Sequence, residues 1–368
     1  MTTEDLTPST PSTPSTPSTP GNGTVLVTGG TGFVGGHSVA RLLRAGHRTR
    51  VTLREPGQEA YVLAALRDAE VDPADRLECV VADLGADHGW AAAMDGVGHV
   101  LHHASPFPIT PPETAEELIL PARDGTLRVL AAARAAGVSR VVMTSSFAAV
   151  GYTPKPGNHF SETDWTDPDT EGLPAYHTSK VLAERAAWDY VRAHGDIELT
   201  VIVPTGIFGP QLGDRISGSA ELVRDMLTGK MPAVPVMHFG VVDVRDVVDL
   251  HLRAMLDPKA AGERFIAVSG SSTSFFGMAR ILREHFPAAA DLLPSTELTV
   301  EQVVEAAKTE PALRQAATLR GRIPVISNEK ARSVLGWEPR DARETIVATA
   351  DSLFRHGVTL PETTGDRS

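Results

Sequence analysis

The 368-residue chain is poor in cysteine, in long apolar runs and in positive charge, and each shortage excludes a class of protein. Its one cysteine, Cys79, excludes an internal disulfide and a cysteine-rich zinc site, and it indicates a reducing compartment. No apolar run approaches the roughly 18 residues that a membrane-spanning helix needs. Lys and Arg number 34 against 46 Asp and Glu, so the formal net charge is −12. General nucleic-acid binding, which needs clustered cations, is therefore not expected.

The remaining composition, 42% hydrophobic and 22% charged residues, is ordinary for a globular protein. The length allows one large α/β domain or two smaller ones. Residues 1–23 repeat Ser, Thr and Pro, with neither a basic start nor an apolar stretch. This pattern predicts a disordered tether rather than a secretory signal, and therefore a cytoplasmic protein. Residues 356–368 are expected to form a flexible tail.

Short runs rich in β-branched residues alternate with helical stretches from residue 24 onward. Strands are expected at 24–28, 50–53, 77–82, 97–102, 140–144 and 198–203, and helices at 38–45, 59–69, 89–94, 113–136 and 175–194. This alternation predicts an α/β fold, with a doubly wound parallel sheet covered by helices on both faces. After about residue 204 only a helix over 244–255 and a strand over 264–268 are legible. We expect a main domain over 24–204 and a smaller C-terminal lobe over 205–355, parts of which return to the main domain.

A glycine-rich turn over residues 28–35 (TGGTGFVG) lies between the first expected strand and the first expected helix. Glycines there permit positive φ angles and let the backbone approach a pyrophosphate at the helix N-terminus. Gly29, Gly32 and Gly35 have the spacing of short-chain dehydrogenases. Gly30 with the last two of these fits the general dinucleotide fingerprint. The turn therefore predicts a Rossmann-type dinucleotide site.

The residue after the second strand distinguishes the two nicotinamide nucleotides. An acidic residue there binds the ribose 2′-hydroxyl of NAD, whereas an arginine accommodates the 2′-phosphate of NADP. Arg54 follows the strand directly, so NADP(H) is favoured as the cofactor. The alternatives are NAD(H), which Glu55 near the acidic position would suit, and a surface role for Arg54.

Tyr176 and Lys180 lie four residues apart on the helix expected over 175–194, so their side chains share one helix face. A phenol with a pKa near 10 is a poor acid at neutral pH, but a nearby ammonium favours its charged form. Such a tyrosine can protonate a carbonyl oxygen as a hydride arrives. Ser145 and Ser146, which follow the strand over 140–144, are both candidates for a hydroxyl that binds the same oxygen.

Together these motifs resemble the extended short-chain dehydrogenase/reductases of the NAD-dependent epimerase/dehydratase superfamily. Within it, they are similar to the dihydroflavonol reductase/cinnamoyl-CoA reductase-like branch. The resemblance runs from residue 24 to about residue 337 and implies Ser146, rather than Ser145, as the catalytic serine beside Tyr176 and Lys180. The cofactor-binding positions that it implies are Gly29, Gly32, Phe33, Val34, Gly35, Arg54, Asp83, Leu84, Ala104, Ser105, Tyr176, Lys180, Pro204, Thr205 and Ile207.

Two departures from that branch bear on the substrate. Residues 173–177 lack the tryptophan-tyrosine-cysteine signature of cinnamoyl-CoA reductases. Gly151 stands where plant dihydroflavonol reductases carry an asparagine that reads a flavonoid ring. Both departures weigh against a CoA thioester or a flavonoid as the substrate.

The sequence thus predicts an NADPH-dependent carbonyl reductase that acts on a hydrophobic or aromatic aldehyde or ketone. The 205–355 lobe is expected to bind the substrate, against a wall that includes Phe107, Phe147, Tyr152 and Phe208. The alternatives are a 3β-hydroxysteroid dehydrogenase, an NAD-dependent nucleotide-sugar epimerase/dehydratase and a non-catalytic NADP-sensing protein. No metal is expected, because the adjacent histidines at 102 and 103 have no further Cys, His or carboxylate at zinc-ligand spacing. We expect a monomer or homodimer whose partner is a small molecule, with neither nucleic acid nor membrane bound.

Overall fold

The computed structural model describes residues 23–106 and 114–361. Most of the expected tether, Phe107 and the final residues 362–368 lie outside these ranges. Within them, every helix is too short or too polar to cross a lipid bilayer.

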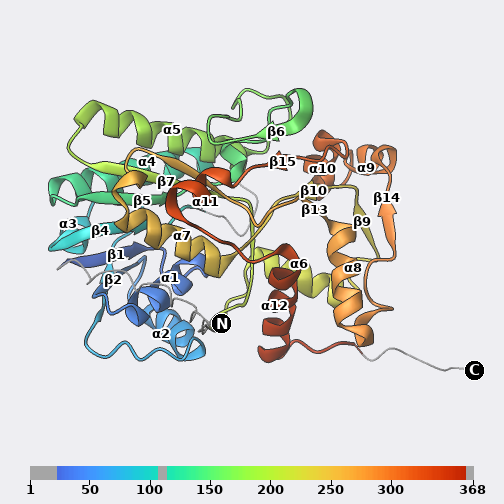
Figure 1. Cartoon of the computed structure of the whole chain (residues 1–368), viewed down its shortest axis with the longest axis horizontal. Coiled ribbons are helices and arrows are strands. Elements are labelled where there is room, and N and C mark those ends of the chain that lie inside the picture. Colours follow the sequence, from blue (N-terminus) through green and yellow to red (C-terminus); the bar gives the residue numbers. More distant parts are fainter. Residues whose placement is uncertain (1–22, 107–113, 362–368) are drawn as a thin grey trace, which may run out of the picture.

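A parallel sheet of seven strands forms the centre of the larger part of the molecule (Figure 1). Its order is β3-β2-β1-β4-β5-β7-β12, and every neighbouring pair is parallel. The strands are β1 (Thr24–Thr28), β2 (Thr49–Leu53), β3 (Leu77–Val81), β4 (Val97–His102), β5 (Arg140–Thr144), β7 (Glu198–Pro204) and β12 (Arg264–Ala267). Because the chain leaves β1 in one direction and returns to β4 on its other side, a crevice opens between the carboxyl ends of these two strands.

Helices cover both faces of this sheet, which confirms the predicted α/β class. One layer consists of α1 (Phe33–Arg44), α2 (Glu59–Asp68) and α7 (Val244–Leu256), and the other of α3 (Trp90–Met94), α4 (Glu116–Ala135) and α5 (Ala175–His194). Successive residues of β1 serve the two layers, since Val25 and Val27 belong to the first core and Leu26 to the second. This alternation explains why the strand is apolar at every position.

The smaller lobe packs around its own core of buried side chains, among them Met226, Met278 and Leu353. Its helices are α6 (Gly218–Leu227), α8 (Phe275–His285), α9 (Val300–Ala306), α10 (Arg314–Leu319) and α12 (Ala342–Arg355). Its short strand pairs include β8 (Gly206–Phe208) with β11 (Val241–Asp243) and β10 (His238–Phe239) with β13 (Thr273–Ser274). The helix α11 (Glu329–Leu335) and Trp337 return to the first core of the main sheet.

The expected bounds of β1, β4, β5 and α5 are confirmed, but α1 begins at Phe33, five residues before its expected start. The expected start lies after the glycines, a residue type that disfavours a helix interior. Tertiary packing overrides that preference: a Cβ atom on Gly35 would lie 2.1 Å from the Gly29 carbonyl oxygen, so no larger residue fits there.

Candidate active site

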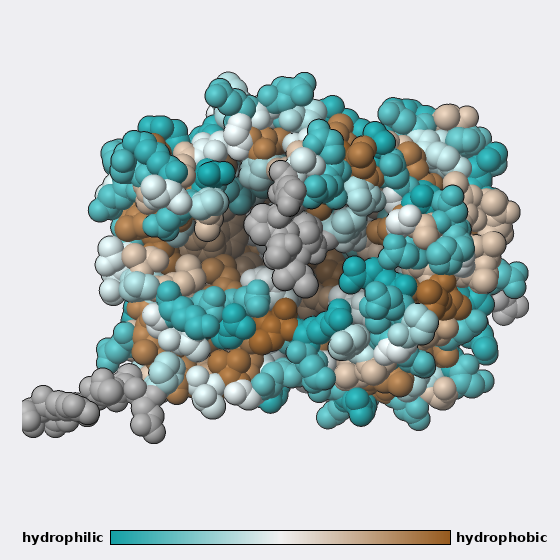
Figure 2. All heavy atoms as spheres, turned by 180° about the vertical axis from the view of Figure 1, so that it is seen from behind, coloured by the Kyte–Doolittle hydropathy of each residue, from teal (hydrophilic) through white to brown (hydrophobic). Residues whose placement is uncertain are grey.

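A cavity of about 720 Å³ opens at the carboxyl ends of the central strands. The glycine turn, the end of β5 and the start of α5 line it from the main sheet, and β10 and the α10 region line it from the smaller lobe. Figure 2 shows a face of the molecule that is hollowed near its centre, with hydrophobic side chains visible in the recess. A cavity of this size is in the range that small-molecule sites occupy.

In the glycine turn the backbone itself forms part of the cavity wall, at a place where a side chain would not fit. Gly29 has a φ of +71°, and a Cβ atom there would lie 2.9 Å from the Ala104 backbone nitrogen. Gly32 is the N-cap of α1 and offers no side-chain cap, so the first N–H groups of this helix stay available. The turn therefore fits a dinucleotide pyrophosphate, which needs close backbone approach and free N–H donors.

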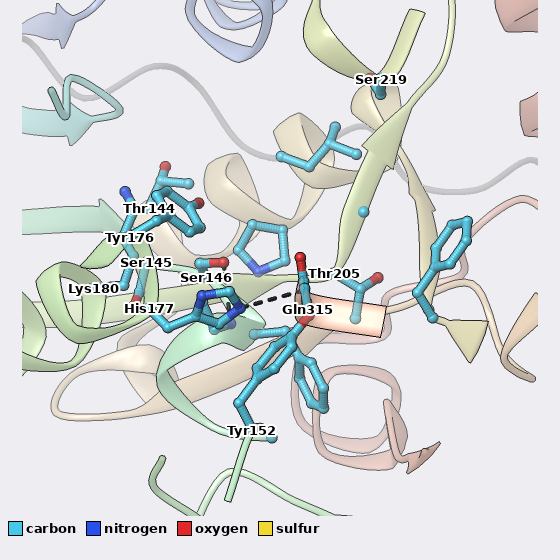
Figure 3. A pocket seen from close by; sticks show the side chains of 18 of the residues that line it. Thr144, Ser145, Ser146, Tyr152, Tyr176, His177, Lys180, Thr205, Ser219 and Gln315 are labelled. Atoms are coloured by element: carbon cyan, nitrogen blue, oxygen red, sulfur yellow. Dashed lines mark hydrogen bonds between the residues drawn. The ribbon is translucent and has the colours of Figure 1, made fainter. Parts of the chain in front are cut away.

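Helix α5 places Tyr176 and Lys180 on the same cavity wall. The helix starts after Pro174, its N-cap, and stops at Gly195, which has a φ of +71°. The ammonium nitrogen of Lys180 lies 5.6 Å from the centre of the Tyr176 ring, and both residues line the cavity. Figure 3 shows the two side chains together with Ser146 at one side of the cavity. The predicted trio is thus brought together beside the glycine turn.

Ser145 and Ser146 both line the cavity, but their hydroxyl groups are engaged differently. The Ser145 hydroxyl donates to Oε2 of the fully buried Glu184 at 2.5 Å. The Ser146 oxygen only accepts a hydrogen bond, 3.2 Å long, from the Ala148 backbone N–H. No described residue accepts the Ser146 hydroxyl proton, so this proton is available to a ligand.

Arg54 and Asp83 follow β2 and β3 at the edge of the crevice, outside the cavity itself. Arg54 is exposed, and among the described residues its guanidinium has no partner; only its backbone N–H is bonded, to Gln58 Oε1 at 3.2 Å. The Asp83 carboxylate caps a turn by accepting from the Gly85 N–H at 2.6 Å. Glu55 is exposed as well, so local geometry leaves both of the residues that could read the ribose accessible.

The predicted cofactor positions divide into two groups. Those that line the cavity are Gly29, Gly32, Phe33, Val34, Gly35, Ser105, Tyr176, Lys180, Pro204, Thr205 and Ile207. Arg54, Asp83, Leu84 and Ala104 do not line it. They lie beyond the ends of β2, β3 and β4, along the direction that a dinucleotide takes from the glycine turn.

A directed hydrogen-bond chain, which the sequence did not predict, includes His103 and Thr144 of the cavity wall and two buried residues behind them. His251 Nδ1 lies 2.7 Å from the Val247 carbonyl oxygen, so it carries the proton. Burial lowers the pKa of His251 to about 4, so the ring is neutral and Nε2 accepts from the Thr144 hydroxyl at 2.8 Å. Thr144 then accepts from His103 Nδ1 at 2.7 Å, and His103 Nε2 accepts from the Ser38 hydroxyl at 2.9 Å.

This chain fixes His103 as a neutral wall residue. Burial lowers its pKa well below the usual range, and both ring nitrogens are already bonded. His103 is therefore unsuited to proton transfer with a ligand. Within residues 23–106 and 114–361, no group of three or more His, Cys, Asp or Glu side chains is arranged to hold a metal.

Acidification is expected to destabilise the fold through these buried histidines. In the unfolded chain a histidine binds its proton near pH 6.5, whereas His251 in the fold resists protonation down to about pH 4. Between these values the unfolded state holds more protons, so the free energy of unfolding falls as pH falls, by up to about 1.4 kcal/mol per pH unit for each such histidine. Urea titrations between pH 6.5 and 4.5 should show a shallower dependence for His251→Gln than for the unaltered protein. Equal slopes would contradict this account.

Of the residues predicted to form the substrate wall, Phe147 and Tyr152 line the cavity. Phe208 instead is buried in the core of the smaller lobe at 3% exposure. Its ring stacks on Phe239, with 6.1 Å between centroids, and Phe239 lines the cavity. A Cβ atom on Gly151 would lie 2.1 Å from the Phe147 ring, so the glycine is what lets that ring occupy its place.

Helix α10 contributes Gln315 to the same part of the cavity, a residue that no sequence pattern identifies. Gln315 donates to the Tyr152 hydroxyl oxygen at 3.1 Å, and its amide nitrogen lies 3.5 Å from His177 Nε2 (Figure 3). The rings of Tyr152 and His177 meet edge to face at 4.1 Å. Burial raises the pKa of Tyr152 to about 12 and lowers that of His177 to about 4, so both rings are neutral at pH 7.

Comparison with known proteins gives one family and consistent relatives. Residues 25–267 match the family described as "NAD dependent epimerase/dehydratase family". Cinnamoyl-CoA reductase CAD2 of Medicago truncatula is 32% identical over 339 residues, which cover 89% of this chain and 95% of that protein. Dihydroflavonol 4-reductase of Zea mays is 32% identical over 276 residues, covering 72% and 75%. The crystal structure of yeast methylglyoxal/isovaleraldehyde reductase Gre2 complexed with NADPH superimposes with a TM-score of 0.75 at 27% identity, covering 90% of this chain and 98% of that one.

Proposed function

This chain belongs to the NAD dependent epimerase/dehydratase family, and from that premise we propose that it is an NADPH-dependent carbonyl reductase. Its general activity is that of an NADP-dependent oxidoreductase, and its relatives include the dihydroflavonol reductase and cinnamoyl-CoA reductase branch. The observation that carries the proposal is the placement of Ser146, Tyr176 and Lys180 on one cavity beside the glycine turn. We propose an aldehyde or ketone with an apolar or aromatic body as the substrate.

The cofactor would lie along the crevice, and the residues present fit it. The backbone of the glycine turn would meet the pyrophosphate, and Arg54 would pair with the 2′-phosphate. Lys180 would hold the nicotinamide ribose, beside the wall formed by residues 204–207. When bound, NADPH supplies a hydride to the carbonyl carbon.

The protein's own residues would then bind and protonate the carbonyl oxygen. Ser146 donates its free hydroxyl proton to this oxygen as a hydrogen bond and so orients the carbonyl. Tyr176 transfers its phenolic proton to the same oxygen as negative charge develops there. The ammonium of Lys180, 5.6 Å from the phenol ring, stabilises the phenolate that this transfer leaves behind. His103 takes no part, because its nitrogens are committed to Ser38 and Thr144.

Arg54→Gln tests the choice of cofactor. Removal of a charge-assisted contact to the 2′-phosphate should raise the KM for NADPH about ten-fold or more and leave the KM for NADH nearly unchanged. Steady-state kinetics with the two cofactors measure this difference. Arg48→Gln, which alters an exposed cation paired with Asp75, is the matched control and should change neither value. An equal change with both cofactors would contradict the role of Arg54.

A further inference from the structure

The charged residues that line the cavity are all cationic. Among the described residues, Lys180 and Arg322 line it, whereas no aspartate or glutamate does. This is unexpected for a chain with a formal net charge of −12, whose carboxylates outnumber its cations. Lys180 is accounted for by the proposed chemistry with Tyr176, but Arg322 has no part in that chemistry.

Arg322 is held in place without being neutralised. Its Nε donates to the Leu319 carbonyl oxygen at 3.0 Å, and its Nη2 donates to the Thr318 carbonyl oxygen at 2.9 Å. Both acceptors belong to the last turn of α10, where a cation is favoured by the helix dipole. No carboxylate in the described part of the chain forms an ion pair with this guanidinium.

These two bonds leave hydrogen-bonding capacity at the end of the guanidinium. Five N–H donors are available to an arginine, and the bonds to α10 occupy one on Nε and one on Nη2. Nη1 and the second hydrogen of Nη2 form the forked pair that matches the two oxygens of a carboxylate. The two bonds to α10 therefore orient the guanidinium of Arg322 and leave its Nη1–Nη2 edge available to another partner.

Arg322 lines a different wall of the cavity from the proposed catalytic residues. Gln315, Leu319 and Arg322 line the wall that the smaller lobe contributes, whereas Ser146 and Tyr176 line the wall that the main sheet contributes. Apolar and aromatic side chains make up much of the lining, among them Phe147, Tyr152, Phe160, Phe239 and Leu319. A ligand that reaches both walls would carry its carbonyl at one place and a second polar group at another.

We propose that Arg322 recognises a carboxylate on the substrate, so that the enzyme acts on oxo-carboxylates whose aldehyde or ketone and carboxylate are joined by an apolar body. This inference rests on the proposed carbonyl reductase activity and narrows its substrate class. Arg322 is a specificity-determining residue in this account, because it binds the substrate from the wall opposite in origin to the one that carries Ser146 and Tyr176. An anion in a partly buried cavity gains more from a forked cation than it would in water.

Two aldehydes that differ in charge test the inference: 4-formylbenzoate and methyl 4-formylbenzoate. NADPH oxidation gives kcat/KM for each, and calorimetric titration in the presence of NADP⁺ gives each Kd without turnover. The full chain is compared with Arg322→Gln, Arg322→Lys and the control Arg314→Gln, which removes an exposed charge from α10 without altering the cavity lining. Comparing the carboxylate-to-ester ratio between variants cancels the different intrinsic reactivities of the two aldehydes.

The expected result is a ratio of carboxylate to ester, in kcat/KM and in affinity, that falls ten-fold or more in Arg322→Gln. Arg322→Lys should restore part of the ratio through its charge, and Arg314→Gln should leave it unchanged. Equal losses for both aldehydes, or an unchanged ratio, would mean that Arg322 only caps α10 and would overturn the inference. Absence of NADPH oxidation with any aldehyde or ketone would instead contradict the proposed reductase activity. The ratio of the two Kd values, which needs no turnover, tests the role of Arg322 separately.

Discussion

Tyr176→Phe is expected to lower kcat about 100-fold or more while NADPH still binds. The substitution removes only the phenolic hydroxyl, so the carbonyl oxygen loses its proton donor, and positioned acid–base groups contribute roughly this factor or more. Lys180 and the glycine turn keep their places, because the packing of the ring on α5 is unchanged. Single-turnover measurements with saturating NADPH, together with the Kd of NADPH from fluorescence, separate the chemical step from cofactor binding.

Tyr190→Phe is the matched control for this experiment. Tyr190 lies on the same helix, but its ring stacks on His194 and does not line the cavity. It should therefore have normal kcat and normal cofactor affinity. Undiminished turnover in Tyr176→Phe would contradict the acid–base role proposed for this residue. A loss confined to NADPH affinity would assign it to cofactor binding alone.

Glu184→Gln is expected to lower the free energy of unfolding by about 3–5 kcal/mol, the cost of leaving a buried partner charge uncompensated. Glu184 is fully buried, and its Oε1 lies 2.6 Å from Arg264 Nε, whose side chain is 9% exposed. The same carboxylate accepts the Ser145 hydroxyl and the Trp188 indole N–H. Because Gln has nearly the same volume, the loss would reflect charge rather than packing. Guanidinium titration monitored by circular dichroism measures it.

Two further variants make that prediction specific. Glu305→Gln breaks an ion pair with Lys308 whose side chains are 74% and 64% exposed, and it should change stability by at most about 1 kcal/mol. The double variant Glu184→Leu/Arg264→Met replaces both buried charges with apolar groups and should recover much of the stability that Glu184→Gln loses. A double variant no better than the single one would show that the charges act through their separate neighbours rather than as a pair.

The features of the site that the sequence predicted depend on short stretches of chain. The glycine turn is encoded within eight residues, and a hydroxyl–ammonium pair four residues apart on a helix must share a face. The strand runs are recognisable because a parallel strand buried on both faces is apolar throughout, as Val25, Leu26 and Val27 are. The start of α1 was less predictable, since its first turn contains Gly35, where close packing against Gly29 leaves no room for a side chain.

The substrate end depends on contacts that no local pattern encodes. Gln315 meets Tyr152 across 163 residues of sequence, and His251 meets Thr144 across 107. Phe208 and Phe239 are both aromatic residues of short strands, but packing buries the first in the lobe and leaves the second on the cavity wall. Composition and spacing do not distinguish such residues.

The sequence alone therefore determined the α/β class, the dinucleotide turn and the spacing of Tyr176 and Lys180, since each follows from hydrogen-bond geometry within one or two elements. Only the tertiary structure decided which serine hydroxyl is free, which histidines are held as neutral rings and which residues of the smaller lobe line the cavity. The reason is that these properties arise when chain segments far apart in sequence are packed together and desolvated. Arg322 illustrates this: in the sequence it is one of many arginines, and it becomes a candidate recognition group only because α10 holds it at a cavity whose described lining contains no carboxylate.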